Sequence, residues 1–423
     1  MPDYTATGGR HFGGTPGIAM DGVAAVPRGG ALERVALVSL LLFIAAVQVS
    51  IAAANILLAV TAILWLTLVL TRQEVVEVPR MFWPLAAYAA ITLISAVFSV
   101  DYRISIVDSK QLVLFAIVPI AYRLLRGEKA LTAVDVIIGM AAISAAIGIV
   151  QFGIFKFDVI GQRPRGALGM YMTYSGQLML VACLAAARVL FRKGDRVWPL
   201  LVLAAIVVAL TTTISRNAWV GGCVGIGLLF VMRDFRLFAL VPVLAALFFA
   251  FAPSHISDRL WSMFQIKDAY NQTATTQASV LSNRDRIAMM KTGIRIIKDY
   301  PLTGVGPDMV IQMYPRYRDK DAINQLNPHL HNVPLQIAAE RGVPALLIWL
   351  WFVATLIIDF VRMRRSAAES FLPYAGLASV AAMLAAGMFE HNFGDSEFLM
   401  LFLLLVTLPY AAAQRSSRKG AAA

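Results

Sequence analysis

The chain has 423 residues, of which 59% are hydrophobic and only 15% are charged. Soluble globular domains are about 45–50% apolar and about 25% charged. One soluble core cannot enclose so much apolar side chain, so an ordinary soluble enzyme, a disordered protein and a disulfide scaffold are excluded. The apolar runs are long and unbroken rather than alternating, which predicts an all-α integral membrane protein.

The 37 Lys and Arg residues outnumber the 25 Asp and Glu residues, giving a net charge of +12. In a soluble protein this excess would indicate nucleic acid. In a membrane protein, cationic flanks beside membrane lipids and an anionic ligand explain it better. No nucleic-acid partner is therefore expected.

Residues 1–30 are rich in Gly, Ala and Pro and lack periodicity, which predicts a disordered tail. About twelve apolar segments of transmembrane type follow. They cover residues 35–50, 52–71, 81–99, 105–122, 131–153, 167–190, 198–214, 217–232, 236–253, 343–361, 371–389 and 397–413. Residues 31–253 thus hold helices one to nine, residues 343–413 hold the last three, and residues 414–423 form a second tail.

The basic residues predict the orientation. With the N-terminus in the cytoplasm, the inside loops and tails carry 20 Lys and Arg residues and the short outside loops carry 7. Cytoplasmic loops are enriched in basic residues, so both termini are predicted to be cytoplasmic. Residues 254–342 then form a large outer loop between helices nine and ten. A loop of this length is more often functional than decorative.

A helix is predicted within this loop over residues 283–299, capped by Ser282 or Asn283. Its apolar stripe comprises Ile287, Met290, Ile294 and Ile297. A basic stripe beside it comprises Arg284, Lys291, Arg295 and Lys298. This amphipathic pattern favours contact of the basic stripe with lipid phosphates. Arg286 lies on the other edge of the apolar stripe, so its guanidinium is predicted to face inward.

Residues 301–307, PLTGVGP, form a turn with two glycines. A phosphate-binding nest and a purely structural turn are both open here, and a GxG alone favours the structural turn.

The next segment, NPHLHN, ends at Asn332. Asn332 as N-cap and Pro334 in the first turn predict a helix that stops at Gly342. His329 and His331 are two residues apart, but no cysteine or close carboxylate completes a ligand set, so no metal site is expected. For His331, a solvated histidine and a catalytic base are the two alternatives.

Arg216 lies in SRNAW, the polar break between two apolar segments. A charge at the bilayer centre costs roughly 2.5–3.5 kcal/mol, and less near the interface. Arg216 is therefore either functional or an interfacial arginine that snorkels to water.

Three further groups of polar residues fall outside the membrane or interrupt it. Arg163 and Arg165 add two cations to the outer loop before residue 167. Tyr174 and Gln177 interrupt an apolar helix, where they either line a cavity or hydrogen-bond between helices. The last outer loop holds Glu390, His391, Asp395 and Glu397, which are interpreted as a solvated turn.

Three blocks together resemble the O-antigen ligase family. They are SRNAW with Arg216, Arg286 with the following KTGIRIIKDYPLTGVGP, and HNVPLQIAAERG from His331. The wider superfamily also contains O-antigen polymerases and protein O-oligosaccharyltransferases. The resemblance implies a GT-C-like glycosyltransferase of the Gram-negative inner membrane with a periplasmic active site. It also implies inverting transfer of O-antigen from undecaprenyl pyrophosphate to lipid A–core oligosaccharide, without metal or cofactor.

The chemistry of the residues agrees with this resemblance. Guanidinium groups match phosphate oxygens bidentately, so Arg216 and Arg286 are assigned to the leaving pyrophosphate. His331 is assigned as the general base for the acceptor hydroxyl. Substrate-binding roles are expected for a wider set, namely Arg163, Arg165, Tyr174, Gln177, His329, Asn332 and Glu340.

Two alternatives remain. A twelve-helix transporter predicts two repeats of six helices, whereas this chain places its large loop after the ninth. An O-antigen polymerase, or another lipid-linked oligosaccharide transferase, would use similar donor chemistry.

Overall fold

The structure is a computed structural model that describes residues 30–72, 75–157, 162–239, 274–366 and 371–420. The predicted N-terminal tail, most of the ninth predicted span and the first part of the predicted outer loop lie outside these residues. The described part of the chain is built from helices and contains no strand. This confirms the all-α prediction for that part.

The first half of the chain contains α1 (Ala31–Ala46), α2 (Ile51–Arg72), α3 (Phe82–Val97), α4 (Tyr102–Asp108), η1 (Ser109–Ala116), α5 (Ile117–Leu124), α6 (Lys129–Gly153), α7 (Tyr171–Phe191), α8 (Val197–Thr212), α9 (Arg216–Arg233) and η2 (Phe235–Ala239). The second half contains α12 (Ala274–Asp299), α13 (Val310–Tyr317), α14 (Val333–Met363), α15 (Phe371–Gly387), η3 (Asn392–Gly394) and α16 (Ser396–Gly420). Each predicted span except the ninth coincides with a helix. The last helix continues well into the predicted C-terminal tail.

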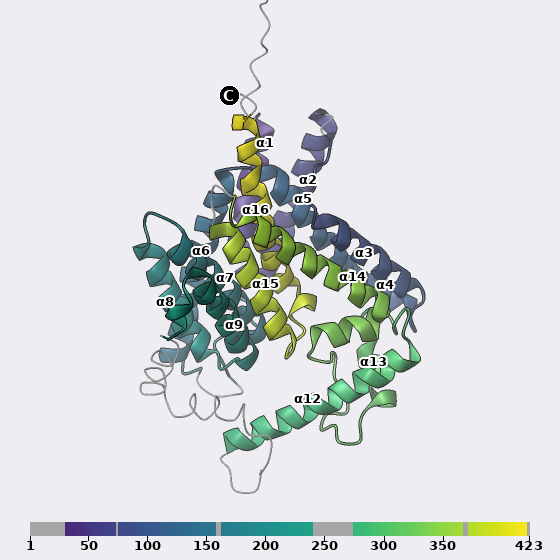
Figure 1. The fold of residues 1–423 in the computed structure, drawn as a ribbon. Coiled ribbons are helices and arrows are strands. Elements are labelled where there is room, and N and C mark those ends of the chain that lie inside the picture. Colours follow the sequence, from purple (N-terminus) through teal and green to yellow (C-terminus); the bar gives the residue numbers. More distant parts are fainter. Residues whose placement is uncertain (1–29, 73–74, 158–161, 240–273, 367–370, 421–423) are drawn as a thin grey trace, which may run out of the picture.

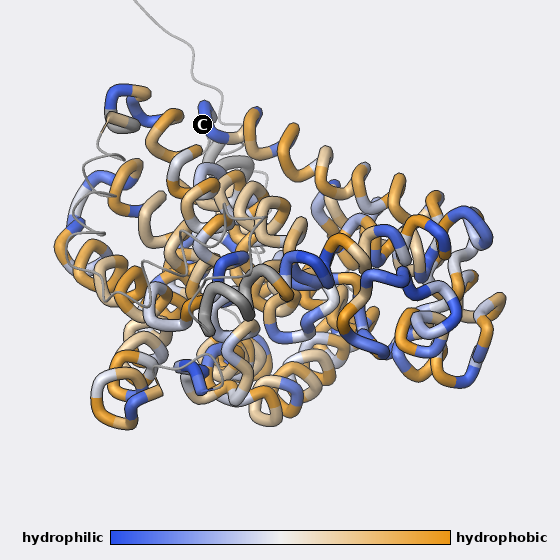
Figure 2. The backbone as a smooth tube through the Cα atoms, turned by 90° about the horizontal axis from the view of Figure 1, so that it is seen from below, coloured by the Kyte–Doolittle hydropathy of each residue, from blue (hydrophilic) through white to orange (hydrophobic). Residues whose placement is uncertain are grey.

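Within the part of the chain that the structure describes, six helical segments are long and apolar enough to cross a membrane: α2, α4 to α5, α6, α7, α14 and α16. Three shorter apolar helices, α3, α8 and α15, accompany them. The chain is therefore a multi-pass membrane protein. In Figure 2 the bundle helices are mainly hydrophobic, and hydrophilic residues gather in the connecting segments. The apolar windows of α7 and α16 are 83% and 72% buried, against 22% for α2, so α7 and α16 lie at the centre of the bundle.

The loops predicted to be cytoplasmic meet at one end of the bundle. Glu33, at the start of α1, forms ion pairs with Arg72 (3.1 Å), Arg123 (3.6 Å) and Lys129 (3.3 Å). The described C-terminal end lies at the same end in Figure 1. This grouping is what an alternating topology requires, and the side of the membrane on which it lies stays a prediction.

At the opposite end, α12 and α13 extend across the bundle (Figure 1). Helix α12 begins at Ala274, so the prediction of a cap at Ser282 or Asn283 is wrong. Asp285 therefore lies within the helix, where its buried carboxylate accepts hydrogen bonds from the backbone N–H groups of Ile323 and Asn324. These bonds tie the following loop to α12.

The predicted apolar stripe of α12 is not its buried face, and the predicted basic stripe does not face lipid. The buried face consists of Asp285, Ala288, Met289, Thr292, Gly293 and Ile296. The apolar residues Ile287, Met290 and Ile294 remain 46–47% exposed. Three of the four basic residues pair with carboxylates of the loop: Arg284 with Asp321, Lys291 with Asp319 and Asp321, and Arg295 with Asp319. The basic stripe thus holds protein carboxylates, which corrects the expectation that it serves lipid phosphates.

Helix α14 is divided by Gly342, whose φ of 82° is not helical. The predicted stop at Gly342 is therefore confirmed, and the predicted span that follows it continues beyond the kink. A kink removes hydrogen-bond partners from the carbonyl groups of the preceding turn.

The glycine turn supplies these partners. The N–H groups of Val305 and Gly306 donate to the carbonyls of Ala339 (3.0 Å) and Glu340 (2.8 Å). A Cβ at Gly304 would lie 2.2 Å from the backbone of Glu340, so a side chain there would prevent this approach. The structural interpretation of residues 301–307 is thereby favoured over a phosphate-binding nest.

Candidate active site

The turn before α14, which carries His329 and His331, is fixed on both sides. The Asn332 side chain caps α14 by accepting from the N–H of Leu335 (2.9 Å), as predicted, and donates to the Met388 carbonyl (3.2 Å). The Leu330 N–H donates to the Gln336 side chain (2.7 Å). Between these anchors, His331 has a φ of 48°, a conformation that costs a non-glycine residue about 1–3 kcal/mol. The anchors therefore hold His331 in a strained and defined orientation.

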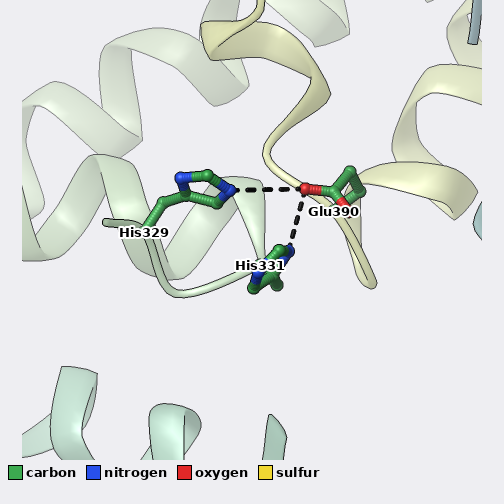
Figure 3. A group of neighbouring side chains, drawn as sticks. All are labelled: His329, His331 and Glu390. Carbon is green, nitrogen blue, oxygen red and sulfur yellow. Dashed lines mark hydrogen bonds and ion pairs between the residues drawn. The ribbon is translucent and has the colours of Figure 1, made fainter. Parts of the chain in front are cut away.

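Glu390, from the loop between α15 and η3, meets both histidines (Figure 3). Its Oε1 lies 2.9 Å from His331 Nδ1 and 3.6 Å from His329 Nε2. The backbone N–H of His391 donates to the same oxygen (3.1 Å). Burial raises the pKa of Glu390, but hydrogen bonds and charge from the two histidines outweigh it and hold the pKa well below its usual range. Glu390 is therefore a carboxylate at neutral pH.

This geometry decides how His331 works. An ionised carboxylate only accepts hydrogen bonds, so its contact with Nδ1 requires the proton of neutral His331 to reside on Nδ1. The lone pair then lies on Nε2, on the opposite side of the ring. His331 is thus prepared to accept a proton at Nε2.

Arg286, on α12, interacts electrostatically with the same group. It is half-buried, and burial lowers its pKa while the charge of Glu390 and the Tyr171 hydroxyl act in the opposite direction. Arg286 therefore interacts electrostatically with Glu390 and with Tyr171, the first residue of α7. Its partial burial agrees with the inward orientation inferred from the helical stripes, and its role in the site stays a prediction.

Arg216 is the first residue of α9 and approaches α12. Its guanidinium lies 3.5 Å from Ser282 Oγ. Ser282 and Arg286 are four residues apart on α12, so they occupy the same helical face. Arg216 thus contacts α12 one helical turn before Arg286, although the two arginines are 70 residues apart in the sequence. A cation pair beside the N-terminus of α9 favours an anion there.

A cavity of about 240 Å³ adjoins these residues. Its polar lining includes Thr173, Asn217, His329, Glu390, His391 and Asp395. Asn217 follows Arg216 directly, and His329 is two residues from His331, so the cavity lies between the arginine and histidine segments. This volume is below the roughly 300–1,000 Å³ of drug-sized pockets. The cavity, as the described residues line it, therefore suits a sugar ring or a phosphate group rather than a glycan chain.

The two other predicted arginines take different places. Arg163 is half-buried and lies over the ring of Tyr171, 4.4 Å from its centroid. Because Tyr171 also interacts with Arg286, Arg163 lies at the edge of the site. Arg165 is exposed and lies over Phe157, 5.8 Å from its centroid.

Tyr174 and Gln177 hold helices together. The Tyr174 hydroxyl donates to the Ser144 carbonyl of α6 (3.0 Å), and the side chain is fully buried. The Gln177 amide donates to the carbonyls of Val47 (3.0 Å) and Glu397 (3.2 Å). These contacts favour the interhelical alternative, and substrate binding by the two residues stays a prediction that no contact here supports.

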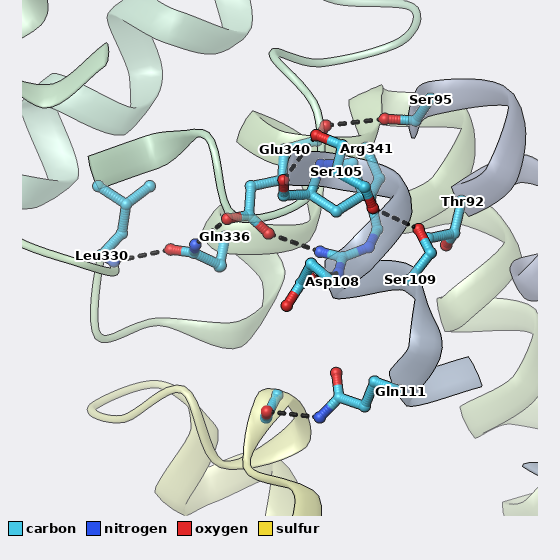
Figure 4. A network of polar contacts seen from close by, with 12 residues as sticks. Thr92, Ser95, Ser105, Asp108, Ser109, Gln111, Leu330, Gln336, Glu340 and Arg341 are labelled. Carbon is cyan, nitrogen blue, oxygen red and sulfur yellow. Dashed lines mark hydrogen bonds and ion pairs between the residues drawn. The ribbon is translucent and has the colours of Figure 1, made fainter. Parts of the chain in front are cut away.

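Glu340 also lies away from the cavity. It forms a buried network with Gln336 (2.7 Å) and Arg341 (2.7 Å), and Asp108 lies 3.9 Å from the Arg341 guanidinium (Figure 4). Each of its carboxylate oxygens is thus bonded within the protein. These contacts favour a structural role for Glu340 over the predicted role in substrate binding.

Sequence reasoning missed the last loop. Glu390 and Asn392 are buried, and His391 is half-buried, with desolvation as the main cause that lowers its pKa to about 3. The interpretation as a solvated turn is therefore wrong. One available signal was a carboxylate and a histidine in a short loop between two strongly apolar segments, where solvated charge has little room.

These observations define a class of protein: a helical, multi-pass membrane protein with a cationic and histidine-containing site at one end of its bundle. Residues 200–350 match the family model described as O-antigen ligase. The match supports the resemblance found in the sequence, and residues 200–350 are similar to the O-antigen ligase family. No curated protein matches the chain at a significant level. Arg216, Arg286 and His331 lie within the matched range, and Glu390 lies beyond it.

Proposed function

We propose that the protein is an O-antigen ligase of the Gram-negative inner membrane. It would transfer O-antigen from undecaprenyl pyrophosphate to a sugar hydroxyl of lipid A–core oligosaccharide at the periplasmic face. The observation that supports the proposal is the His331–Glu390 pair, whose carboxylate lines the cavity and interacts electrostatically with Arg286. Arg216 contacts Ser282, one helical turn before Arg286. The family match supports the reaction class.

In this proposal the arginines act on the leaving group. When the bond between the anomeric carbon and the pyrophosphate oxygen breaks, negative charge develops on that oxygen. Arg216 and Arg286 stabilise the charge because guanidinium binds phosphate oxygens bidentately. The helix N-terminus beside Arg216 adds partial positive charge.

His331 acts on the acceptor. Its Nε2 takes the proton of the core hydroxyl as the hydroxyl oxygen attacks the anomeric carbon from the face opposite the pyrophosphate. The new glycosidic bond therefore has inverted configuration, and undecaprenyl pyrophosphate leaves. The imidazolium that forms is stabilised by Glu390, whose carboxylate contacts Nδ1 at 2.9 Å.

A polymerase would use the same donor chemistry with a different acceptor. The test is to incubate the purified protein with lipid-linked O-antigen and either lipid A–core or a second lipid-linked glycan. A ladder of glycosylated core supports the ligase. Longer lipid-linked glycans without glycosylated core would assign the protein as a polymerase, and no product with either acceptor would reject both.

A further inference from the structure

We propose that His329, His331 and Glu390 form a binding site for a transition metal such as Zn²⁺, and that metal bound there inhibits glycosyl transfer. The site uses the side chains of Figure 3 in a second role. The binding part stands independently, and the inhibition part rests on the function proposed above.

The three ligand atoms have the spacing of a metal site. His329 Nε2, His331 Nδ1 and a Glu390 carboxylate oxygen all lie within 4.8 Å of one another. Zinc with bonds of about 2.0–2.1 Å holds tetrahedral ligands about 3.3 Å apart. The distances from Glu390 Oε1, 2.9 Å to His331 and 3.6 Å to His329, bracket this value. Small side-chain movements therefore suffice to form the site.

The ligand set suits zinc. Two imidazoles and one carboxylate occur in zinc sites that keep an open fourth position. His329 lines the cavity and its side chain is 32% exposed, so an ion can enter and a water molecule can fill that position. The prediction that no carboxylate lies near the histidines is wrong, because Glu390 approaches them from 59 residues away in the sequence.

A buried oxygen atom of Glu390 also supports a metal site. Glu390 Oε2 is buried and has no hydrogen-bond partner within the described part of the chain. A buried acceptor without a partner carries a desolvation penalty, and an ion is one way to relieve it. Arg286 also interacts with Glu390. The positive charge of Arg286 disfavours a second cation beside Glu390. We therefore expect zinc to bind more weakly than a structural zinc and to be removed by a chelator.

Metal binding would disable the base through its tautomer. A neutral imidazole that binds metal through Nδ1 must carry its proton on Nε2. In the proposed reaction Nε2 needs a lone pair to accept the acceptor's proton. The ion and the reaction therefore require opposite tautomers of His331, so zinc occupancy and transfer exclude each other.

The binding test uses full-length, untagged protein in detergent, freed of metal by chelator and titrated with Zn²⁺ in a calorimeter. One equivalent should bind, and Mg²⁺ should not. His329→Ala and Glu390→Gln should each weaken binding by more than the roughly 10–100-fold typical of outer-shell partners. Asp321→Asn is the matched control, because this half-exposed carboxylate lies in the same outer segment and should leave affinity unchanged. Absence of binding, or equal binding by all three variants, would overturn the site.

The activity test measures transfer by the same preparations. Zinc should inhibit the wild type, and chelator should restore the rate. His329→Ala should need more than about tenfold more zinc for half-inhibition, relative to its own metal-free rate. Full activity at saturating bound zinc would overturn the inhibition. Zinc binding by a protein that shows no metal-free transfer would instead reject the proposed function and leave the binding site intact.

Discussion

Two buried polar clusters are joined through α14 and its N-terminal turn, and they differ in how they are closed. The Glu340 cluster pairs a carboxylate with Arg341, and the side chains are only 4% and 10% exposed. The Glu390 cluster pairs a carboxylate with His331 and His329, which are 18% and 32% exposed. The first cluster is sealed between α14, α4 and the glycine turn. The second opens onto the cavity.

This difference distinguishes a cluster that supports the fold from a cluster that takes part in the proposed reaction. The Glu340 cluster lies at the kink, and Ser95 Oγ donates to the carbonyls of both Thr303 (2.7 Å) and Glu340 (3.0 Å). The partners of Glu340 are the Arg341 guanidinium, the Gln336 amide and, at its backbone carbonyl, the Ser95 hydroxyl. The Glu390 cluster contains titratable imidazoles held at a strained turn. One rigid cluster thus fixes α14, and the other uses that rigidity to present His331 Nε2.

The comparison is tested most strongly at His331. His331→Ala removes the proposed base, so the transfer rate should fall roughly 10²–10⁴-fold. Expression, thermal stability and donor binding should change little, because the arginines hold the pyrophosphate. The measurement is initial rate and donor affinity in matched preparations. Unchanged ligation would remove His331 from the mechanism.

Substitution of Arg286 should lower the transfer rate almost as much as substitution of His331. Arg286→Ala should lower the rate roughly 10²–10³-fold, as expected for loss of one donor to a developing charge. Lysine should rescue it only partly because it lacks the bidentate fork.

Arg284→Ala is the matched control for Arg286. Arg284 lies two residues earlier on α12 and pairs with Asp321 at 3.6 Å in an exposed contact worth about 0–1 kcal/mol. Equal losses of rate in the two alanine variants would mean that the position on the helix does not matter.

Glu390→Gln tests whether this carboxylate acts through His331. Glutamine can still accept from Nδ1 but cannot stabilise the imidazolium by charge, so we expect a roughly 10–100-fold lower kcat. Donor KM should stay the same. In a His331→Ala background, the same substitution should cost little further activity, since both residues serve one step. Additive losses would assign Glu390 a separate role.

The sequence predicted the local parts of this site well. Long apolar runs predict helices because each span must satisfy its own backbone hydrogen bonds in lipid. The Asn332 cap and the stop at Gly342 follow from side-chain chemistry within a few residues.

The sequence could not predict which carboxylates enter the site. Glu390 reaches His331 because α15 returns to the same end as α14, a tertiary contact without a local pattern. Glu340 and Tyr174 have the polar side chains expected of site residues, but their contacts with Arg341 and Ser144 favour structural roles. The start of α12 was also missed, since Ser282 has the chemistry of a cap although the helix continues through it.

The sealed cluster should respond to substitution in stability rather than in rate. Glu340→Ala leaves Arg341 as a buried charge without its main partner, which costs roughly 3–5 kcal/mol. Thermal unfolding in detergent should show a clear decrease in Tm. A Glu340→Gln, Arg341→Met double variant should recover part of it, because both charges are removed together. A loss of donor affinity at unchanged Tm would return Glu340 to the substrate site.

Removal of metal should have the smallest effect. In the proposed mechanism Arg216 and Arg286 neutralise the leaving pyrophosphate, so no step needs a divalent cation. Transfer measured in EDTA should therefore equal or slightly exceed the untreated rate, the excess arising where trace zinc had occupied the Glu390 cluster. Mg²⁺ added back should change nothing. Loss of transfer in EDTA that Mg²⁺ or Mn²⁺ restores would show that a metal rather than the two arginines carries the leaving group's charge. It would also mean that the difference between the two clusters does not explain catalysis.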